Sequence, residues 1–252
     1  MPATNDTDAQ AFITAASISN STQESAINTL VTSLKSAGVW TKAKAIYPIV
    51  GGSAAAHKFN LKNPVDSDAA FRIVWGGVLT HGANGVTSGS GGYGATKLIA
   101  STSLSLTSAS LFVAGSYAIS ARAAAVDDGS NSYFLIAPVI SGSLYARAFG
   151  TSPGQVAVAN TDTVGVFGLS RTANNLLKAY KAGTSIGSDV ATFTGNLPTK
   201  ELYLLAENAN GSVGSAVAGS RMTFAFVGDG LTDAEVTSLT NAINTFNSAL
   251  SR

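Results

Sequence analysis

The chain of 252 residues has no cysteine, few charged side chains and no excess of basic residues. Without cysteine there is no disulfide framework, no thiolate metal site and no cysteine nucleophile. The formal net charge of +1 provides no basic footprint for nucleic acid, so no nucleic-acid partner is expected. No apolar run approaches the roughly 18 residues of a membrane-spanning helix, so no membrane insertion is expected. The first 20 residues hold no Lys, no Arg and no continuous apolar run, so no secretory signal is expected.

Charge is the scarcest property of the chain. Charged residues make up 12% of it, about half of the usual quarter. A folded chain of this size exposes on the order of 10,000 Å², so its 15 basic and 14 acidic side chains lie at roughly one per 350 Å². Two interpretations follow: other subunits cover much of this surface, or it faces uncharged polar ligands such as glycans. A charge-poor monomer is the third alternative.

The two ends of the chain show helical patterns. Three capping-box patterns, in which a hydroxyl and a Glu or Gln satisfy free helix N–H groups, begin at Thr7, Ser21 and Thr232. The second is followed by apolar residues at helical spacing and by Gly38, which favours a helix end, so we predict a helix over 22–37. The third opens a predicted C-terminal helix over 232–250, whose apolar stripe indicates that it packs on other elements. Residues 1–38 are therefore predicted to form an N-terminal helical segment.

Between residues 69 and 227 the apolar pattern has period two or consists of short runs. It predicts ten strands, at 70–75, 98–106, 110–119, 133–140, 144–148, 156–159, 163–170, 176–181, 202–206 and 222–227. Turn residues such as Asp127–Ser130 and Asn210–Gly211 separate them. Because no helical pattern lies between these strands, we expect a mainly β fold, an antiparallel jelly-roll sandwich. Residues 39–68 are predicted as a connector, so that the sandwich unit with its C-terminal helix spans 39–252.

Residues 82–95 are rich in Gly and Ser and are predicted to form a flexible loop. Gly89, Gly91 and Gly94 match the spacing of the dinucleotide-binding fingerprint. That fingerprint requires a preceding parallel strand and a following helix, whose N-terminus binds the pyrophosphate. Neither is indicated here, so no nucleotide cofactor is expected.

Acidic residues do not suggest a catalytic pair. Glycoside hydrolysis normally needs two carboxylates within about 5–9.5 Å of each other. Two of the four glutamates belong to capping patterns and the other two flank one strand about 20 Å apart: Glu24 and Glu235, then Glu201 and Glu207. Two aspartate pairs are equally typical of turns: Asp66 with Asp68, and Asp127 with Asp128. We therefore predict no catalytic residue.

The two histidines, His57 and His81, are 24 positions apart without nearby cysteine or spaced carboxylates. This pattern favours hydrogen-bonded structural histidines over metal ligands, and no metal or other cofactor is predicted. No strand–Gly-x-Ser-x-Gly–helix pattern accompanies either of them, although a Ser-His-Asp triad is not excluded by counting. A calcium site formed by oxygen atoms of loop Asp and Asn residues stays open, without EF-hand spacing to support it.

Aromatic residues are the best binding candidates. Trp75, His81, Asn84 and Tyr93 border the Gly-rich loop, where sandwich proteins commonly carry recognition. Flat rings receive the apolar C–H faces of sugars, while Asn and backbone groups orient the hydroxyls. These four residues are the predicted glycan site. The alternative is that Trp75 is a core residue and Tyr93 begins a strand.

Several stretches resemble bacteriophage virion proteins of the tail-fibre and surface type that carry a concanavalin A-like (laminin-G-like) jelly roll. The resemblance lies in the runs 8–16, 23–28, 34–40, 45–52, 57–62, 68–72, 170–172, 178–183 and 228–232. It is densest over 8–82 and 165–246 and thin between 98 and 160. One departure is Ala182-Gly183, where the family often has Asn-Gly at a tight turn. These motifs look structural and carry no catalytic set.

The resemblance implies a non-enzymatic structural protein at the surface of a phage virion, in a tail or head fibre. Its expected partners are other copies of itself in a homo-oligomer and other virion proteins, with host-surface glycan as a further expected ligand. The first alternative is a capsid-decoration or assembly protein with no ligand. The second is a polysaccharide-cleaving enzyme, which the scarcity of paired carboxylates places last.

Overall fold

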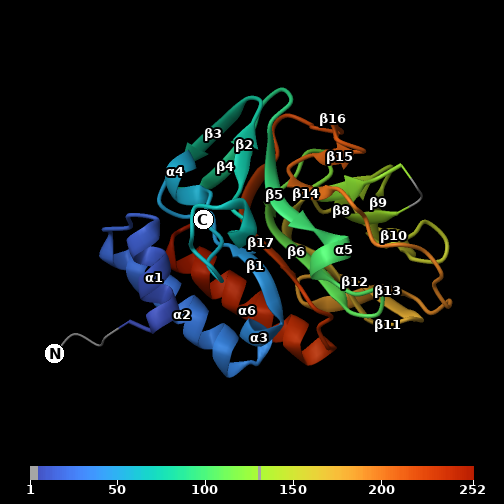
Figure 1. Cartoon of the computed structure of the whole chain (residues 1–252), viewed down its shortest axis with the longest axis horizontal. Helices are drawn as coiled ribbons and strands as arrows, with labels where there is room; N and C mark the ends of the chain where they lie inside the picture. The colour runs from blue at the N-terminus through green and yellow to red at the C-terminus, as the bar shows by residue number, and fades with distance from the viewer. Residues whose placement is uncertain (1–4, 130–131) are drawn as a thin grey trace.

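The computed structural model describes residues 5–129 and 132–252, which form three layers: a layer of helices and two stacked β-sheets (Figure 1). Residues 1–4 of the predicted helical segment and Ser130 of the predicted turn lie outside the described residues. The total accessible surface is 9365 Å², close to the area expected from chain length. No described helix is both long enough and apolar enough to span a membrane.

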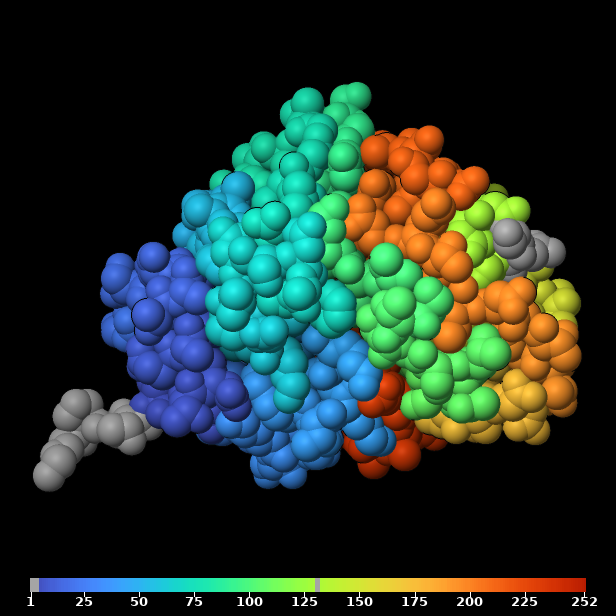
Figure 2. Space-filling model, in the orientation of Figure 1, coloured from blue at the N-terminus to red at the C-terminus, as the bar shows by residue number. Residues whose placement is uncertain are grey.

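The helices belong mostly to the two ends of the chain. They are α1 (Thr7–Ala15), α2 (Ser21–Ser36), α3 (Val39–Lys42), α4 (Ala54–His57), α5 (Ala100–Ser103) and α6 (Asp233–Ala249), with a 3-10 turn at Asp68–Ala70. The first three and α6 bury their apolar stripes together on the outer side of one sheet. Figure 2 shows the N-terminal helices, in blue, continuous with the rest of the molecule.

The sheet beneath the helices, here called the covered sheet, has eight strands in the order β13-β12-β11-β6-β17-β4-β3, with β1 paired to β17. Every pairing in it is antiparallel. Its strands are β1 (Ala43–Tyr47), β3 (Leu79–Gly82), β4 (Gly85–Ser88), β6 (Ala109–Ser116), β11 (Val164–Ala173), β12 (Leu176–Lys181), β13 (Thr184–Asp189) and β17 (Arg221–Gly228).

The second sheet, here called the open sheet, has nine strands in the order β10-β9-β8-β7-β14-β5-β2, with β15 and β16 at its side. All pairings are antiparallel except that of β15 with β7. Its strands are β2 (Val74–Gly76), β5 (Tyr93–Ile99), β7 (Ala124–Asp127), β8 (Tyr133–Ile140), β9 (Ser143–Ala148), β10 (Gln155–Ala159), β14 (Glu201–Leu204), β15 (Glu207–Ala209) and β16 (Ser212–Gly214). The molecule is therefore a mainly β sandwich, as the period-two pattern predicts.

Alternation of side chains divides the interior into two main cores. The larger lies between the sheets and includes Val113, Phe134 and Phe167, while Phe112 and Phe226 point to the other side of the covered sheet and pack under the helices. A small third cluster, Ala125, Leu135 and Ala137, lies on the outer face of the open sheet. Burial of both faces of the covered sheet explains why its central strands are apolar at nearly every position.

Several predicted elements are confirmed. The strands 133–140 and 176–181 have the predicted bounds, and the helices 22–37 and 232–250 are each found within one residue of them. Gly38 has a φ of +72°, the left-handed conformation of a residue that ends a helix. The capping box at Thr232 is present, with Glu235 as its partner.

Other local predictions are wrong. Asp6 and Asn20 cap the first two helices in place of Thr7 and Ser21, since their carboxylate and amide oxygens accept backbone N–H groups. The strand predicted over 98–106 is observed as β5, Tyr93–Ile99, and the helix α5 begins at Ala100. In the segment 70–75, predicted as a strand, the first residue ends a 3-10 turn and only the last two residues belong to a strand, β2 (Val74–Gly76). The connector 39–68 contains an unpredicted strand, β1, which β17 holds in the covered sheet.

The predicted flexible loop 82–95 is also wrong, because it contains β4 and the start of β5. The glycines between these strands pack tightly: the Gly89 N–H donates to the Val78 carbonyl at 2.7 Å, and a Cβ on Gly89 would lie 2.7 Å from a methyl group of Val78. Small residues here permit close backbone approach. The stretch leads directly into the strand β5 (Tyr93–Ile99), and the next helix, α5, begins only at Ala100, so these glycines do not precede a helix N-terminus.

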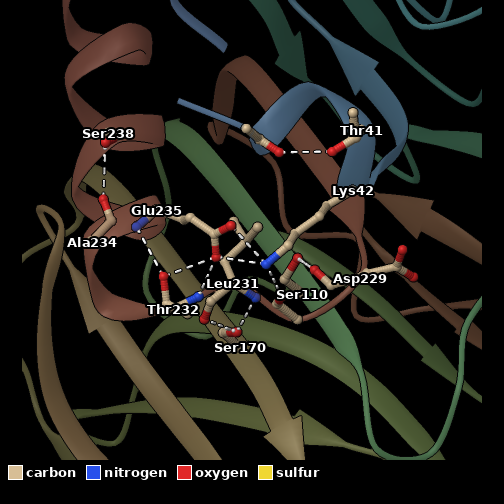
Figure 3. A network of polar contacts seen from close by, with 12 residues as sticks. Thr41, Lys42, Ser110, Ser170, Asp229, Leu231, Thr232, Ala234, Glu235 and Ser238 are labelled. Carbon is tan, nitrogen blue, oxygen red and sulfur yellow. Dashed lines mark hydrogen bonds and ion pairs between the residues drawn. The ribbon is translucent and has the colours of Figure 1, made fainter. Parts of the chain in front are cut away.

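A polar network anchors the start of α6 (Figure 3). The Lys42 ammonium lies 2.7 Å from Glu235, and the Ser170 hydroxyl donates to the Leu231 carbonyl at 2.7 Å while accepting the Leu231 N–H at 2.8 Å. Ser110 donates to the Asp229 carbonyl at 2.7 Å. These bonds give residues 228–232 a structural role, because they join the last strand to the last helix.

Candidate functional site

The structure brings together two of the four residues predicted to bind glycan. Trp75 lies in β2 opposite Gly94, and its ring packs edge-on against the ring of His81 in β3, with 4.9 Å between centroids. Trp75 is half-buried and packs against the core between the sheets, and its indole N–H is buried without a hydrogen-bond partner in the described residues. This pair therefore bridges edge strands of the two sheets.

His81 is bonded to the other histidine of the chain. The Gly52 N–H donates to Nε2 of His57 at 3.1 Å, so this nitrogen is an acceptor and the neutral His57 carries its proton on Nδ1. That proton is donated to Nδ1 of His81, 3.0 Å away. Burial, followed by the nearby His81 and Arg252, lowers the pKa of His57 to about 3. Because both Nδ1 atoms and Nε2 of His57 are used, the pair serves as a structural link.

The other two predicted residues lie elsewhere. Asn84 is exposed in the turn between β3 and β4. Tyr93 lies two positions before Ala95 in β5, and the cross-strand partner of Ala95 is Tyr203. The ring of Tyr93 stacks on the ring of Tyr203, with 4.7 Å between centroids. Alternation along β5 therefore directs Tyr93 to the outer face of the open sheet, whereas Trp75 opposite Gly94 faces the interior.

The helices pack on the covered sheet, so the outer face of the open sheet lies on the side of the sandwich away from them (Figure 1). Directly paired residues share a face, so the pairing defines one row across it: Val74, Ala95, Tyr203, Ala125, Leu135, Arg147 and Gln155. We call this surface the open face. Three strand spacings separate Tyr203 from Arg147, about 14 Å.

One half of the open face carries an arginine held by its neighbours. Arg147 Nε donates to Oε1 of Gln155 at 2.5 Å. Its guanidinium lies 4.9 Å from the ring centre of Tyr133 and 5.8 Å from that of Tyr145. Burial, and then the Asp127 carboxylate, raise the pKa of Tyr133, so this phenol stays protonated and able to donate a hydrogen bond. The arrangement provides two aromatic rings and a fixed cation on one surface.

A pocket of about 200 Å³ opens beside these rings, lined by Arg122, Leu135, Ile140, Tyr145 and Arg147. It joins the third apolar cluster to two guanidinium groups. Arg122 Nε lies 3.9 Å from Glu207, beyond hydrogen-bond range, and is buried without a hydrogen-bond partner among the described residues. An apolar floor with a few polar groups at the rim is typical of small-ligand sites.

The aspartates Asp66 and Asp68 and the glutamate Glu201, considered above as catalytic candidates, are paired with cations. Asp66 pairs with Lys58 and Arg72, and Asp68 pairs with the same arginine at 2.8 Å. Hydrogen bonds from Lys58 and then Arg72 lower the pKa of Asp66, the opposite of what a general acid requires. Lys97 pairs with Glu201, on the strand beside it. No group of three or more His, Asp or Glu side chains gathers as metal ligands within the described residues.

Sequence reasoning missed the open face, although one signal was available. In Ser143–Ala148 apolar and polar residues alternate strictly, and the buried positions are Leu144, Ala146 and Ala148. This pattern places Tyr145 and Arg147 together on the opposite face. Arg122 could not be joined to them from the sequence, because the contact depends on the pairing of three strands.

No family model matches the chain, and no curated protein matches its sequence. Solved structures do match. Domain 4 of AbnA, an extracellular GH43 arabinanase from Geobacillus stearothermophilus, in complex with arabinotriose, is 17% identical over 79% of this chain and 98% of that one, with a TM-score of 0.49. The CBM40 domain of the Ruminococcus gnavus IT-sialidase is 14% identical over 54% of this chain and 84% of that one, with a TM-score of 0.45.

A leech intramolecular trans-sialidase is also similar, at 12% identity over 54% of this chain, with a TM-score of 0.43. The match covers only 23% of that longer protein. The likeness to all three is one of fold, at identities too low to transfer a ligand or an activity.

Proposed function

We propose that this chain is a non-enzymatic, glycan-binding structural protein of a bacteriophage virion surface, and that it binds glycan on the open face. The observation that carries the glycan part is the asymmetry of the sandwich. Helices bury the outer side of the covered sheet, whereas the open face has Tyr133 and Tyr145 beside Arg147 and a pocket that Arg147 lines together with Arg122. Its rigid strands hold these groups in place before a ligand arrives.

The chemistry of the open face suits a sugar. The rings of Tyr133 and Tyr145 offer apolar surface to the C–H faces of a pyranose, and each phenol adds a polar tip. Arg122, Arg147 and Glu207 offer donors and acceptors for hydroxyl groups. Between Tyr203 and Arg147 the row is covered, because Ala125 and Leu135 are 0% and 2% exposed. The surface for a sugar is therefore the pocket beside Tyr145 and Arg147.

The virion part of the proposal rests on the resemblance in the runs described above and on the sparse charge. Its proposed partners are other copies of the chain and other virion proteins. Nine of the 15 basic side chains form ion pairs within the described residues, among them Lys35 with Asp6 and Lys178 with Asp233. The exterior therefore carries fewer unpaired charges than the composition alone suggests, which favours contact with neighbouring subunits.

A capsid-decoration role without a ligand is the second candidate. It is favoured by the same neutral surface, and it would leave the open face without a binding partner. A polysaccharide-cleaving enzyme is the third, and the ion pairs of Asp66 and Asp68 argue against it.

A glycan array tests the proposal with three variants. Tyr145→Ala should abolish binding, whereas the matched control Tyr145→Phe should retain most of it because the ring remains. Trp75→Ala tests the site predicted from sequence. Loss of binding in Trp75→Ala with retention in Tyr145→Ala would move the site to the edge strands. An array without any bound glycan would overturn the glycan function and favour assembly.

A further inference from the structure

We infer that the glycan bound by the open face carries a carboxylate, and that Arg122 and Arg147 bind it together. The inference rests on the proposed function and names the chemical class of its ligand. It follows from two guanidinium groups that line one pocket. Several of their N–H groups donate no hydrogen bond within the described residues.

Arg147 is positioned but not neutralised. Its Nε is bonded to Gln155, which fixes the plane of the guanidinium over the Tyr133 ring. Within the described residues Arg147 forms no ion pair, and its two terminal nitrogens donate no hydrogen bond. A guanidinium held on an aromatic ring with both terminal N–H groups available is arranged to bind a carboxylate through two parallel hydrogen bonds.

Arg122 lies in the same pocket and is also incompletely paired. The exposed fraction of its side chain is 24%, and its carboxylate neighbour, Glu207, is 3.9 Å away. The other oxygen of Glu207, Oε2, accepts a hydrogen bond from the Ser215 hydroxyl at 3.2 Å. The buried Nε of Arg122 has no hydrogen-bond partner among the described residues. Its two terminal nitrogens donate no hydrogen bond to a described residue, and these are the groups that a ligand oxygen in the pocket would accept from.

The charge balance of the pocket supports an anion. Two guanidiniums line it, and Glu207 is the carboxylate paired with either of them. Asp127 is the cross-strand partner of Tyr133 and raises the pKa of that phenol. It accepts the Gly129 N–H at 2.8 Å and forms no ion pair with either arginine among the described residues. Surface charges commonly serve solubility, and this chain has few of them. Two arginines placed together around the apolar residues Leu135 and Ile140 therefore need another explanation, such as binding an anion.

The experiment compares an acidic oligosaccharide with its neutral counterpart of the same ring structure. Tri-galacturonic acid and its methyl ester form one pair, and sialyllactose and lactose form another. Binding to the full chain is measured by isothermal titration calorimetry in 50 mM and 500 mM NaCl. We expect at least one acid to bind about tenfold or more tighter than its neutral partner, and this preference to shrink at the higher salt concentration.

Two variants assign the preference to the arginines. Arg147→Gln and Arg122→Gln should each reduce the affinity for the acid to that for its neutral partner, and Arg147→Lys should restore only part of it because it lacks the planar fork. Lys200→Gln, at an exposed position, is the control with the same loss of charge. Circular dichroism establishes that each variant is folded.

The outcomes separate this inference from the proposed function. In one outcome, the acid and the neutral sugar of every pair bind equally well, and this binding is lost in Tyr145→Ala but kept in Arg147→Gln. That outcome would overturn the carboxylate inference and leave glycan binding intact. An acid preference that survives in both arginine variants would also overturn it. Binding of no sugar in the calorimeter or on the array would overturn both.

Discussion

The Nε of Arg147 donates to Oε1 of its cross-strand partner Gln155 at 2.5 Å, and the guanidinium lies 4.9 Å from the ring centre of Tyr133. Three adjacent strands, β8, β9 and β10, thus fix one surface cation. Such preorganisation lowers the conformational entropy that ligand binding would otherwise cost.

A buried amide should prove important for stability. Asn60 Oδ1 accepts the Ile46 N–H at 2.9 Å and the Lys62 N–H at 3.0 Å, while its Nδ2 donates to the carbonyls of Lys44 and Ala70 at 3.2 and 3.1 Å. Asn60→Ala leaves these groups unpaired, so the free energy of unfolding should fall by roughly 2–4 kcal/mol.

Urea unfolding followed by tryptophan fluorescence measures the change. Asn241→Ala, at an exposed position of α6, is the matched control and should change the free energy of unfolding by less than about 0.5 kcal/mol. Equal effects of the two substitutions would contradict the role given to Asn60.

The buried histidine predicts a pH dependence. The pKa of His57 is about 3 in the folded chain, below the model-peptide value of 6.5, so the unfolded chain binds the extra proton between these pH values. The contribution of His57 to stability is therefore fully present above pH 6.5 and is lost as the pH falls toward 3. At pH 5 the loss amounts to about 2 kcal/mol.

Urea midpoints of the wild type and of His57→Gln, taken between pH 7 and pH 5, test this. The variant should be less stable at pH 7 but should lose less stability on acidification. The pKa of His81 is also lowered by burial, so this residue adds a change of the same sign. Parallel pH profiles for the two proteins would show that His57 does not titrate as described.

A substitution in the tight turn between β12 and β13 should stabilise the fold. Its two residues, Ala182 and Gly183, have φ values of +48° and +82°, the left-handed conformations of a two-residue hairpin turn. Ala is strained there and Asn is not, so Ala182→Asn should raise the free energy of unfolding by about 0.5–1 kcal/mol. Thermal unfolding measures it, with Ala182→Val as the destabilising counterpart. A lower melting temperature for the Asn variant would contradict the turn assignment.

The sparse charge predicts association. Light scattering of the purified chain should give a mass of at least twice 25.4 kDa, with little dependence on salt because few charges lie at the surface. A stable monomer at high concentration would contradict the interpretation that copies of this chain cover its surface.

The sequence predicted the fold class and the most apolar strands, but not the strands rich in alanine and glycine. Strands such as Tyr133–Ile140 and Leu176–Lys181 are rich in β-branched, aromatic and leucine residues and bounded by turns, so their pattern was sufficient. In contrast, β7 is the alanine-rich Ala124–Asp127, and β4 begins at Gly85; neither alanine nor glycine favours strands. Pairing with the neighbouring strands holds β4 and β7 extended, and the sequence of the segment itself does not reveal that pairing.

The site was harder to predict for the same reason. The loop-centred hypothesis joined Trp75 and Tyr93 because both border the Gly-rich segment. Side-chain alternation, however, directs Trp75 between the sheets and Tyr93 to the open face, since Gly94 is the cross-strand partner of Trp75. The row from Tyr203 to Gln155 draws on five strands, and the pairing that aligns them depends on the folded chain.

The most direct test of the account is a map of ligand contacts on the isotopically labelled chain by nuclear magnetic resonance. On titration with the tightest-binding oligosaccharide from the array, the account predicts shifts in the amides of β8 and β9, around Tyr145 and Arg147, with those of α2 and α6 unchanged. Shifts confined to the helices, or to the Trp75 and His81 edge, would contradict the claim that the open face is the binding surface.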